Sequence, residues 1–151
     1  MVSIDLDDLD KSILKLLQQD ARLSFAELGR HLNIAETTVR FRVNRLVENG
    51  VITRFAALLD PVKVGLKVSG AILLKIDPAH VDKACKQLIA FRETQYLLQS
   101  TGEYDVVSMI LARDMEHLND LVKRAKMIAG VKDARVSVTT RCLKFDPSIE
   151  L

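Results

Sequence analysis

The chain has 151 residues, of which 48% are hydrophobic and 28% charged; this composition excludes a disordered chain and suits one ordinary domain or two small ones. The formal net charge is only +2, and the first 55 residues carry eight basic and eight acidic side chains. Bulk charge therefore does not indicate a nucleic-acid partner, and any DNA binding has to come from the local placement of arginines.

The two cysteines, Cys85 and Cys142, are far apart and show no CxxC or Cys/His spacing. We therefore expect free thiols in a reducing cytosol rather than a disulfide or a zinc site. The apolar stretches are no longer than strands, and no basic segment precedes an apolar run at the start of the chain. These patterns predict a cytoplasmic protein that does not span a membrane, and no metal or cofactor motif is present.

The first two helices are expected before residue 33. Leucine and isoleucine recur at helical spacing over residues 6–17, after an aspartate-rich start that the helix dipole favours. Ser24 and Glu27 form a capping box, which predicts the start of a second helix. Asn33 then stands where a tight turn is needed, because asparagine tolerates the left-handed conformation.

A third helix is expected to end at Asn49-Gly50, a C-terminal glycine signal. Its predicted inward face is Val39, Val43, Leu46 and Val47. Three short helices joined by tight turns favour a helix-turn-helix. The next segment, 51–59, is apolar and β-prone, and we interpret it as a short strand or a linker.

The rest of the chain alternates between strand and helix patterns in the order βαββαβ, which is typical of a ferredoxin-like α+β domain. Asp77-Pro78 and Asp114 are expected to start the two helices, and Gly102 and Gly130 to sit at turns. The expected strands are Val68–Ile76, Tyr96–Thr101, Asp105–Ala112 and Val131–Phe145. The predicted domains are therefore 1–52, a 53–65 linker strand or hinge, and 66–151.

Three segments in order resemble the Lrp/AsnC, or feast/famine, family of transcriptional regulators: LDDLDKSILKLLQQDAR at 6–22, TVRFRVNRLVENGVI at 38–52 and TGEYDVV at 101–107. The resemblance implies a winged-type helix-turn-helix joined to an effector and assembly domain. Two positions depart from the family pattern. Ala35 stands where the third helix usually has a serine cap, and Asn33 stands where the turn often has glycine.

The arginines of the third helix point to DNA reading. If the valines and Leu46 face the core, the outer and flanking positions are Thr37, Thr38, Arg40, Arg42 and Arg45. Helix-turn-helix proteins read bases with the N-terminal half of this helix, so we expect Thr37, Thr38 and Arg40 near base edges. Arg42 and Arg45 are expected to hold the phosphate backbone, and Arg54 is a candidate flanking phosphate contact.

The resemblance also implies that the second domain forms homodimers, which assemble further up to octamers, and that an amino acid or related molecule binds between dimers. The expected effector residues are Thr101, Gly102, Glu103, Tyr104, Asp105, Ser137 and Thr139. Gly102 would let backbone amides approach a ligand carboxylate, and Glu103 or Asp105 could bind an α-ammonium group.

Two other functions remain open at this point. Some haem-biosynthesis decarboxylases resemble the same family but have lost DNA binding, and the candidate proton-handling groups here would be His31, His80 and His117. Because these histidines look like surface or helix-start residues, and no catalytic set is apparent, we do not expect an enzyme. An effector-free architectural DNA-binding protein would share all the features of the helical domain.

Overall fold

The computed structural model describes residues 5–151, and the chain divides into two compact units. The first, the helical unit, is the chain up to Leu58 together with Phe145–Leu151, and the second, the sheet unit, is Leu59–Lys144. The last seven residues thus group with the helices, although the sequence places all of 66–151 in one domain. The side-chain amide of Gln18 explains this: it donates to the Ile149 carbonyl at 3.0 Å and accepts from the Ile149 N–H at 2.6 Å.

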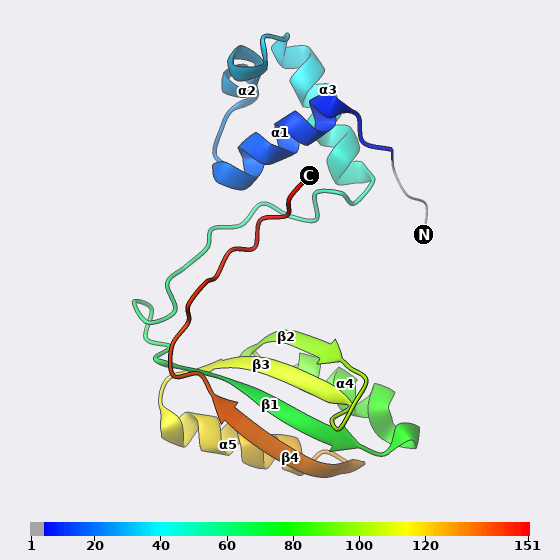
Figure 1. The fold of residues 1–151 in the computed structure, drawn as a ribbon, viewed down its shortest axis with the longest axis vertical. Helices are drawn as coiled ribbons and strands as arrows, with labels where there is room; N and C mark the ends of the chain where they lie inside the picture. The colour runs from blue at the N-terminus through cyan, green and yellow to red at the C-terminus, as the bar shows by residue number, and fades with distance from the viewer. Residues whose placement is uncertain (1–4) are drawn as a thin grey trace. The chain divides into compact units, whose positions relative to one another are not determined.

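The helical unit contains α1 (Asp8–Gln19), α2 (Phe25–Leu32) and α3 (Glu36–Glu48) (Figure 1). The predicted Ser24–Glu27 capping box is present at the start of α2, and Asp7 and Asp10 form another at the start of α1. The three helices enclose an aliphatic core of Ile13, Leu17, Leu28, Val39 and Val43. Val47, which was expected to face inward, is 44% exposed because it lies one residue beyond the buried Leu46, on the flank of α3.

The turn between α2 and α3 depends on two residues. Asn33 has the left-handed φ of 55° that the sequence predicted, and it ends α2. Gly29 lies in α2 against this turn, and its carbonyl accepts a hydrogen bond from the Ile34 N–H at 2.9 Å. A Cβ at Gly29 would come within 2.7 Å of the Ile34 carbonyl oxygen, so only glycine lets the turn pass this closely.

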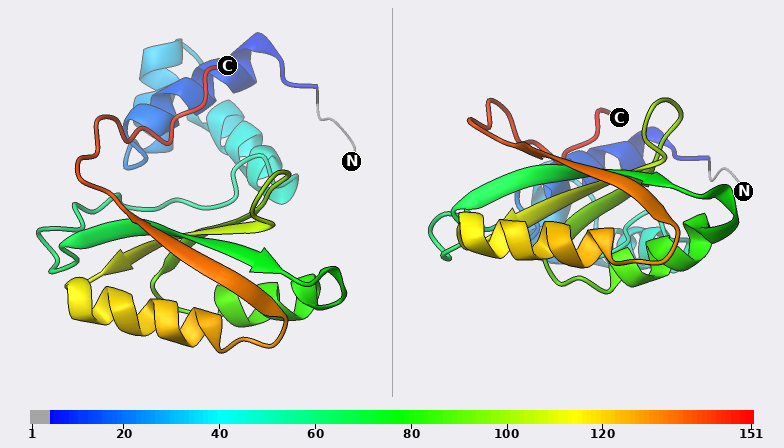
Figure 2. Two further views of the ribbon diagram at one scale, coloured as in Figure 1. Left: turned by 60° about the horizontal axis from the view of Figure 1, so that its bottom comes forward. Right: turned by 90° about the horizontal axis from the view of Figure 1, so that it is seen from below.

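The sheet unit has the predicted βαββαβ order. Its strands are β1 (Val68–Ile76), β2 (Thr94–Gln99), β3 (Val106–Ala112) and β4 (Val131–Val138), arranged antiparallel in the order β2-β3-β1-β4. After β1 a short turn of 3₁₀ helix, η1 (Pro78–His80), leads into α4 (Val81–Ile89), and α5 (Met115–Lys126) follows β3. Both helices cover the same face of the sheet, as both views of Figure 2 show.

Asp77 and Asp114 start the helical segments as expected, because each side chain accepts a backbone N–H two or three residues further on. The main core lies between the sheet and the two helices, where alternate strand residues such as Ile72, Leu74 and Ile110 are buried.

The bounds of four expected segments differ from the structure, one of them by a single residue, since β3 begins at Val106 and not at Asp105. The strand predicted at Tyr96–Thr101 is Thr94–Gln99, because the turn begins at once: the Ser100 N–H donates to the Asp105 carbonyl at 2.9 Å. The last strand ends at Val138 and not at Phe145, because Val138 pairs with Gly70, near the start of β1, and no partner strand continues beyond it. Residues 51–59 form no strand within the described chain, and the Val51 and Ile52 N–H groups donate to the Leu46 carbonyl, so the segment begins packed on the end of α3.

The sheet face opposite α4 and α5, which we call the open face, is apolar over β1, β2 and β3, while β4 contributes Arg135 and Ser137, the partners of Leu73 and Ala71. Its apolar residues alternate with the buried ones in the strand registers: Ala71 and Leu73 of β1, Val107, Met109 and Leu111 of β3, and Tyr96 and Leu98 of β2. Tyr96 and Leu98 are each 53% exposed. Within the sheet unit no element covers this face. Among the described residues, no helix is both long and apolar enough to cross a membrane.

The close approach at Gly29 gives a testable prediction. Gly29→Ala is expected to destabilise the helical unit by about 1–3 kcal/mol, because the added methyl group overpacks against backbone that cannot move aside cheaply. Both tyrosines, Tyr96 and Tyr104, lie in the sheet unit. Far-UV circular dichroism should therefore show a lower melting temperature, while tyrosine fluorescence should not. Arg30→Ala, at an exposed position of the same helix, is the control, and equal melting curves for both variants would contradict the prediction.

Candidate functional site

The outward face of α3 is the candidate DNA-binding surface. Val39, Val43 and Leu46 are at most 2% exposed and fix which side of the helix faces the core. The expected base-reading residues Thr37, Thr38 and Arg40 are all exposed on the other sides, and so is Arg54 beyond the helix. The structure therefore leaves these four side chains accessible from solvent, and their contact with DNA stays a prediction.

Arg42 and Arg45 are held differently. Both guanidinium groups form ion pairs with Asp10 of α1, whose side chain is completely buried; the Arg42–Asp10 distance is 3.3 Å. Arg42 also pairs with Asp7. We call these four residues the α1–α3 clamp. Arg42 and Arg45 were expected to hold the phosphate backbone, and their engagement by carboxylates of the same unit was not predicted from the sequence.

The clamp ties the start of α1 to the middle of α3. The pKa of Asp7 is lowered, mainly because its carboxylate accepts the Asp10 backbone N–H and next because Arg42 donates to it. A carboxyl group with a lowered pKa stabilises the fold at pH values above its unfolded pKa, and this contribution is lost as the pH falls through the folded pKa. At neutral pH the contribution of Asp7 to the clamp is therefore fully present.

Arg40 is the arginine that α3 presents most openly. It pairs with Glu36 one turn earlier at 2.7 Å, and its guanidinium lies 5.2 Å from the centre of the Phe25 ring. Both members of the Arg40–Glu36 pair are largely exposed, and such pairs contribute little, about 0–1 kcal/mol. A phosphate or a guanine can therefore replace Glu36 as the partner of Arg40 at low cost.

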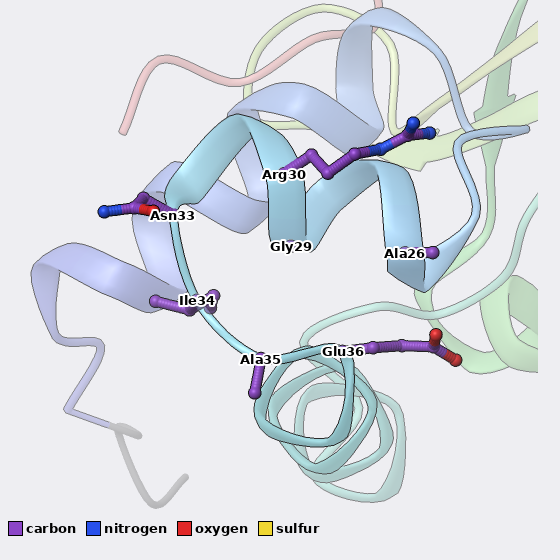
Figure 3. A pocket seen from close by; sticks show the side chains of 7 residues that line it. All are labelled: Ala26, Gly29, Arg30, Asn33, Ile34, Ala35 and Glu36. Atoms are coloured by element: carbon purple, nitrogen blue, oxygen red, sulfur yellow. The ribbon is translucent and has the colours of Figure 1, made fainter.

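The start of α3 lacks a side-chain cap, as the sequence predicted from Ala35. Figure 3 shows Ala35 and Glu36 at this end of the helix, beside a hollow lined by α2 and the turn, including Ala26, Gly29 and Arg30. The first N–H groups of α3 have no capping oxygen from Ala35, and a helix N-terminus favours negative charge. This end of α3 can therefore accept a backbone phosphate.

The expected effector turn, 101–105, is closed by backbone contacts. The Asp105 N–H donates to the Leu74 carbonyl at 2.9 Å, and the Asp105 carboxylate accepts the Ile76 N–H at 2.7 Å. Thr101, Gly102 and Glu103 are exposed. Gly102 has a φ of +129°, and nothing lies within 4 Å of where a Cβ would be, which leaves open space above its backbone. Asp105 thus anchors the turn to β1, while Glu103 remains the freer carboxylate.

Tyr104 is the turn residue with an unused polar atom. Its hydroxyl is buried without a hydrogen-bond partner among the described residues, and burial raises its pKa. The guanidinium of Arg135, on β4, lies 5.8 Å from the centre of the Tyr104 ring. The sequence analysis did not single out Arg135, because strand pairing alone brings it to this turn.

Ser137 and Thr139 lie on the last strand and just beyond it, further along β1 than the turn. The turn contacts β1 at Leu74 and Ile76, whereas Ser137 pairs with Ala71 and the Thr139 N–H donates to the Ser69 carbonyl at 2.8 Å. At about 3.3 Å per residue, the contact at Leu74 and the partner of Ser137 are about 10 Å apart along β1. That the two segments line one ligand site stays a prediction.

Both units match known protein families. Residues 6–53 match the winged helix-turn-helix DNA-binding family, and residues 70–149 match the Lrp/AsnC ligand binding domain. The chain belongs to the Lrp/AsnC family of transcriptional regulators. This confirms the fold class and the resemblance on which the sequence analysis relied.

Relatives of full length support the family assignment. The chain is 39% identical over 140 residues to the HTH-type transcriptional regulator Ptr1 of Methanocaldococcus jannaschii, covering 92% of this chain and 95% of Ptr1. It is 30% identical to the HTH-type transcriptional regulator FL11 of Pyrococcus furiosus, over 92% of each chain.

Solved structures agree. A transcriptional regulator from Neisseria meningitidis in complex with L-methionine matches with a TM-score of 0.91 and 25% identity over 97% of each chain. An AsnC family regulator from Agrobacterium tumefaciens matches with a TM-score of 0.89 and 25% identity, covering 96% of this chain and 97% of that one.

The histidines of this Lrp/AsnC chain have ordinary surroundings. His31 is exposed on α2, and His80 lies 3.9 Å from Asp77 at the start of α4. His117 is 3.3 Å from Glu93 and accepts the Arg113 N–H at 3.2 Å. Within residues 5–151 no three histidine, cysteine, aspartate or glutamate side chains are grouped to hold a metal ion. The family assignment favours transcription regulation over the decarboxylase alternative.

Two residues of the α3 surface were missed by the sequence analysis. Phe41 is 66% exposed, and Asn44 is also exposed on the same side. The signal was present in the sequence: both positions lie opposite Val39, Val43 and Leu46 at 3.6 residues per turn.

The clamp gives a second prediction. Asp10→Asn is expected to destabilise the helical unit by about 3 kcal/mol, because two guanidinium groups lose the buried charge that they share. Urea unfolding followed by far-UV circular dichroism measures this. Asp8→Asn is the matched control, since Asp8 is exposed in the same helical turn. If the two variants unfold at the same urea concentration, the clamp does not hold α1 to α3.

Proposed function

We propose that this Lrp/AsnC protein is a cytoplasmic regulator that binds double-stranded DNA as a homodimer or larger assembly, and that an amino acid or related molecule bound between copies alters this binding. The observation that carries the proposal is the outward face of α3, where Thr37, Thr38 and Arg40 are exposed while the opposite face is buried. A helix presented in this way fits the major groove of B-DNA.

Assembly is supported by the open face of the sheet. It carries seven apolar residues, and Leu98 and Tyr96 each remain half exposed. A contiguous apolar surface of this kind is expensive to leave in water. A second copy of the same chain is the partner that this face fits best, because an antiparallel sheet with helices on one side reaches a stable core when another sheet packs on the other.

Ligand binding between copies is supported by the position of the expected effector residues next to the open face. The turn 101–105 contacts β1 at Leu74 and Ile76, and Ser137 lies on the open face through its pairing with Ala71 of the same strand. The open space above Gly102 and the exposed Glu103 carboxylate suit the carboxylate and ammonium groups of an amino acid. A ligand bound there would shift assembly, since it binds one arrangement of copies better than another.

The DNA proposal predicts sequence-dependent binding to the DNA upstream of the protein's own gene. Affinity for the preferred site should exceed that for random competitor DNA by at least about 10³-fold, and it should fall as salt is raised. Arg40→Ala should relax the preference at one base pair of each half-site. Gel-shift titrations at two salt concentrations measure both effects. Equal affinity for specific and random DNA would contradict a regulatory role and favour an architectural one.

The same titration with each of the twenty amino acids tests the effector proposal. We expect at least one of them to change the affinity for DNA or the molar mass in solution. Thermal-shift measurements at millimolar amino acid provide an independent readout. The absence of any response in all three measurements would contradict effector binding while leaving DNA binding intact.

The open face predicts the oligomeric state. Leu98→Glu should convert the assembly to monomers, because the substitution places a charge on the open face, on the edge strand β2, where it would be buried between the paired sheets, while half exposure of Leu98 lets the monomer fold. Light scattering after size-exclusion chromatography measures the molar mass. Gln99→Glu, the next residue of β2 and exposed, is the control. A variant that keeps the wild-type mass would show that another surface joins the copies.

A further inference from the structure

Phe41 stands out among the exposed side chains of α3. Its side chain is 66% exposed, although phenylalanine is usually buried. With 3.6 residues per turn, Thr37, Phe41 and Asn44 lie along one side of the helix, opposite Val39, Val43 and Leu46, and the exposed Glu48 follows them at the C-terminal end. We call Thr37, Phe41 and Asn44 the reading strip. Within the part of the chain that the structure describes, Phe41 and Asn44 have no hydrogen-bond or ring partner.

The strip does not look like a protein-binding patch. Phe41 is the one large apolar residue among three, and the nearest other exposed apolar residue of α3, Val47, lies about a third of a turn around the helix. Protein interfaces need a contiguous apolar core, which this strip lacks. Instead, the strip combines one apolar ring, a hydroxyl and an amide. The edges of base pairs in the major groove present methyl groups together with hydrogen-bond donors and acceptors, which such side chains can contact.

The charged residues around the strip narrow the choice of bases. Arg42 and Arg45, which could have read guanine, are held by the carboxylates of Asp7 and Asp10. Arg40 lies about a quarter turn away from the strip. The centre of the helix is therefore left with Phe41 and Asn44. Thymine offers a methyl group that suits an apolar side chain, and adenine offers the acceptor and donor pair that suits asparagine.

We propose that the reading strip makes this protein selective for T·A base pairs in the middle of each half-site, with Phe41 contacting a thymine methyl group and Asn44 an adjacent adenine. The inference rests on the proposed function, because it requires α3 to enter the major groove. It assigns a specificity role to two residues and names the chemistry of the bases they recognise.

The test uses the full-length protein and a preferred site obtained by selection from random DNA. Each thymine of the half-site is replaced in turn by deoxyuridine, which keeps the hydrogen bonds of the pair and removes only the methyl group. Wild-type protein should lose about four-fold in affinity at one thymine per half-site, the equivalent of one buried methyl group. Phe41→Ala should bind the thymine site more weakly and should not distinguish thymine from uracil there.

Asn44→Ala should lose its preference for adenine at the adjacent pair and keep the response to the methyl group. Val47→Ala is the control, since Val47 is an exposed apolar residue of the same helix outside the strip. Its methyl response should equal that of the wild type. Circular dichroism melting checks that each variant is folded. We expect all of them to fold, because Phe41, Asn44 and Val47 are exposed.

The outcomes separate the two levels of the proposal. If wild-type protein selects a site but ignores every deoxyuridine substitution, or if Phe41→Ala still distinguishes thymine from uracil, the reading strip is overturned and DNA binding stands. If the protein selects no site, sequence-specific binding and the reading strip fall together.

Discussion

The buried carboxylate of Asp10 is the interaction on which the DNA-binding unit depends. A completely buried charge is costly unless it is paired, and here two guanidinium groups from α3 pair with it. Because Asp10 lies in the first turn of α1, the pairing fixes both the rotation of α3 and its distance from α1. The faces of α3 that meet solvent follow from this one contact together with Val39 and Val43, which are buried beneath it.

The clamp also explains how a nearly neutral unit can serve as a DNA-binding unit. Eight basic and eight acidic side chains precede residue 56, yet two of the arginines and two of the aspartates neutralise each other inside the clamp. Arg40 and Arg54 are exposed, and only the weak surface pair with Glu36 competes for Arg40. Such a surface gives a modest electrostatic attraction to DNA, so recognition has to come largely from the shape and chemistry of α3.

Local signals in the sequence were sufficient for most of the fold. The Ser24–Glu27 capping box, the left-handed Asn33 and the bounds of β1 were predicted correctly, because each depends on residues that are neighbours in the chain. The strand ends that were predicted wrongly are those set by pairing with residues distant in the sequence. β4 ends where its partner strand begins, and β2 starts two residues earlier than expected because β3 extends alongside it. The clamp was missed for the same reason, since Asp10 and Arg45 are 35 residues apart.

The candidate effector site could be predicted from the sequence less completely than the fold. The family resemblance, and no local pattern, suggested the turn 101–105 with Ser137 and Thr139, and strand pairing places the turn's contact at Leu74 three residues along β1 from the partner of Ser137. If the ligand binds where copies meet, as proposed, its occupancy must depend on assembly. Sensing and assembly would share the same contacts, so no separate relay is required between them. What the ligand changes is then the set of DNA-binding helices that one assembly presents together, because each copy contributes its own α3.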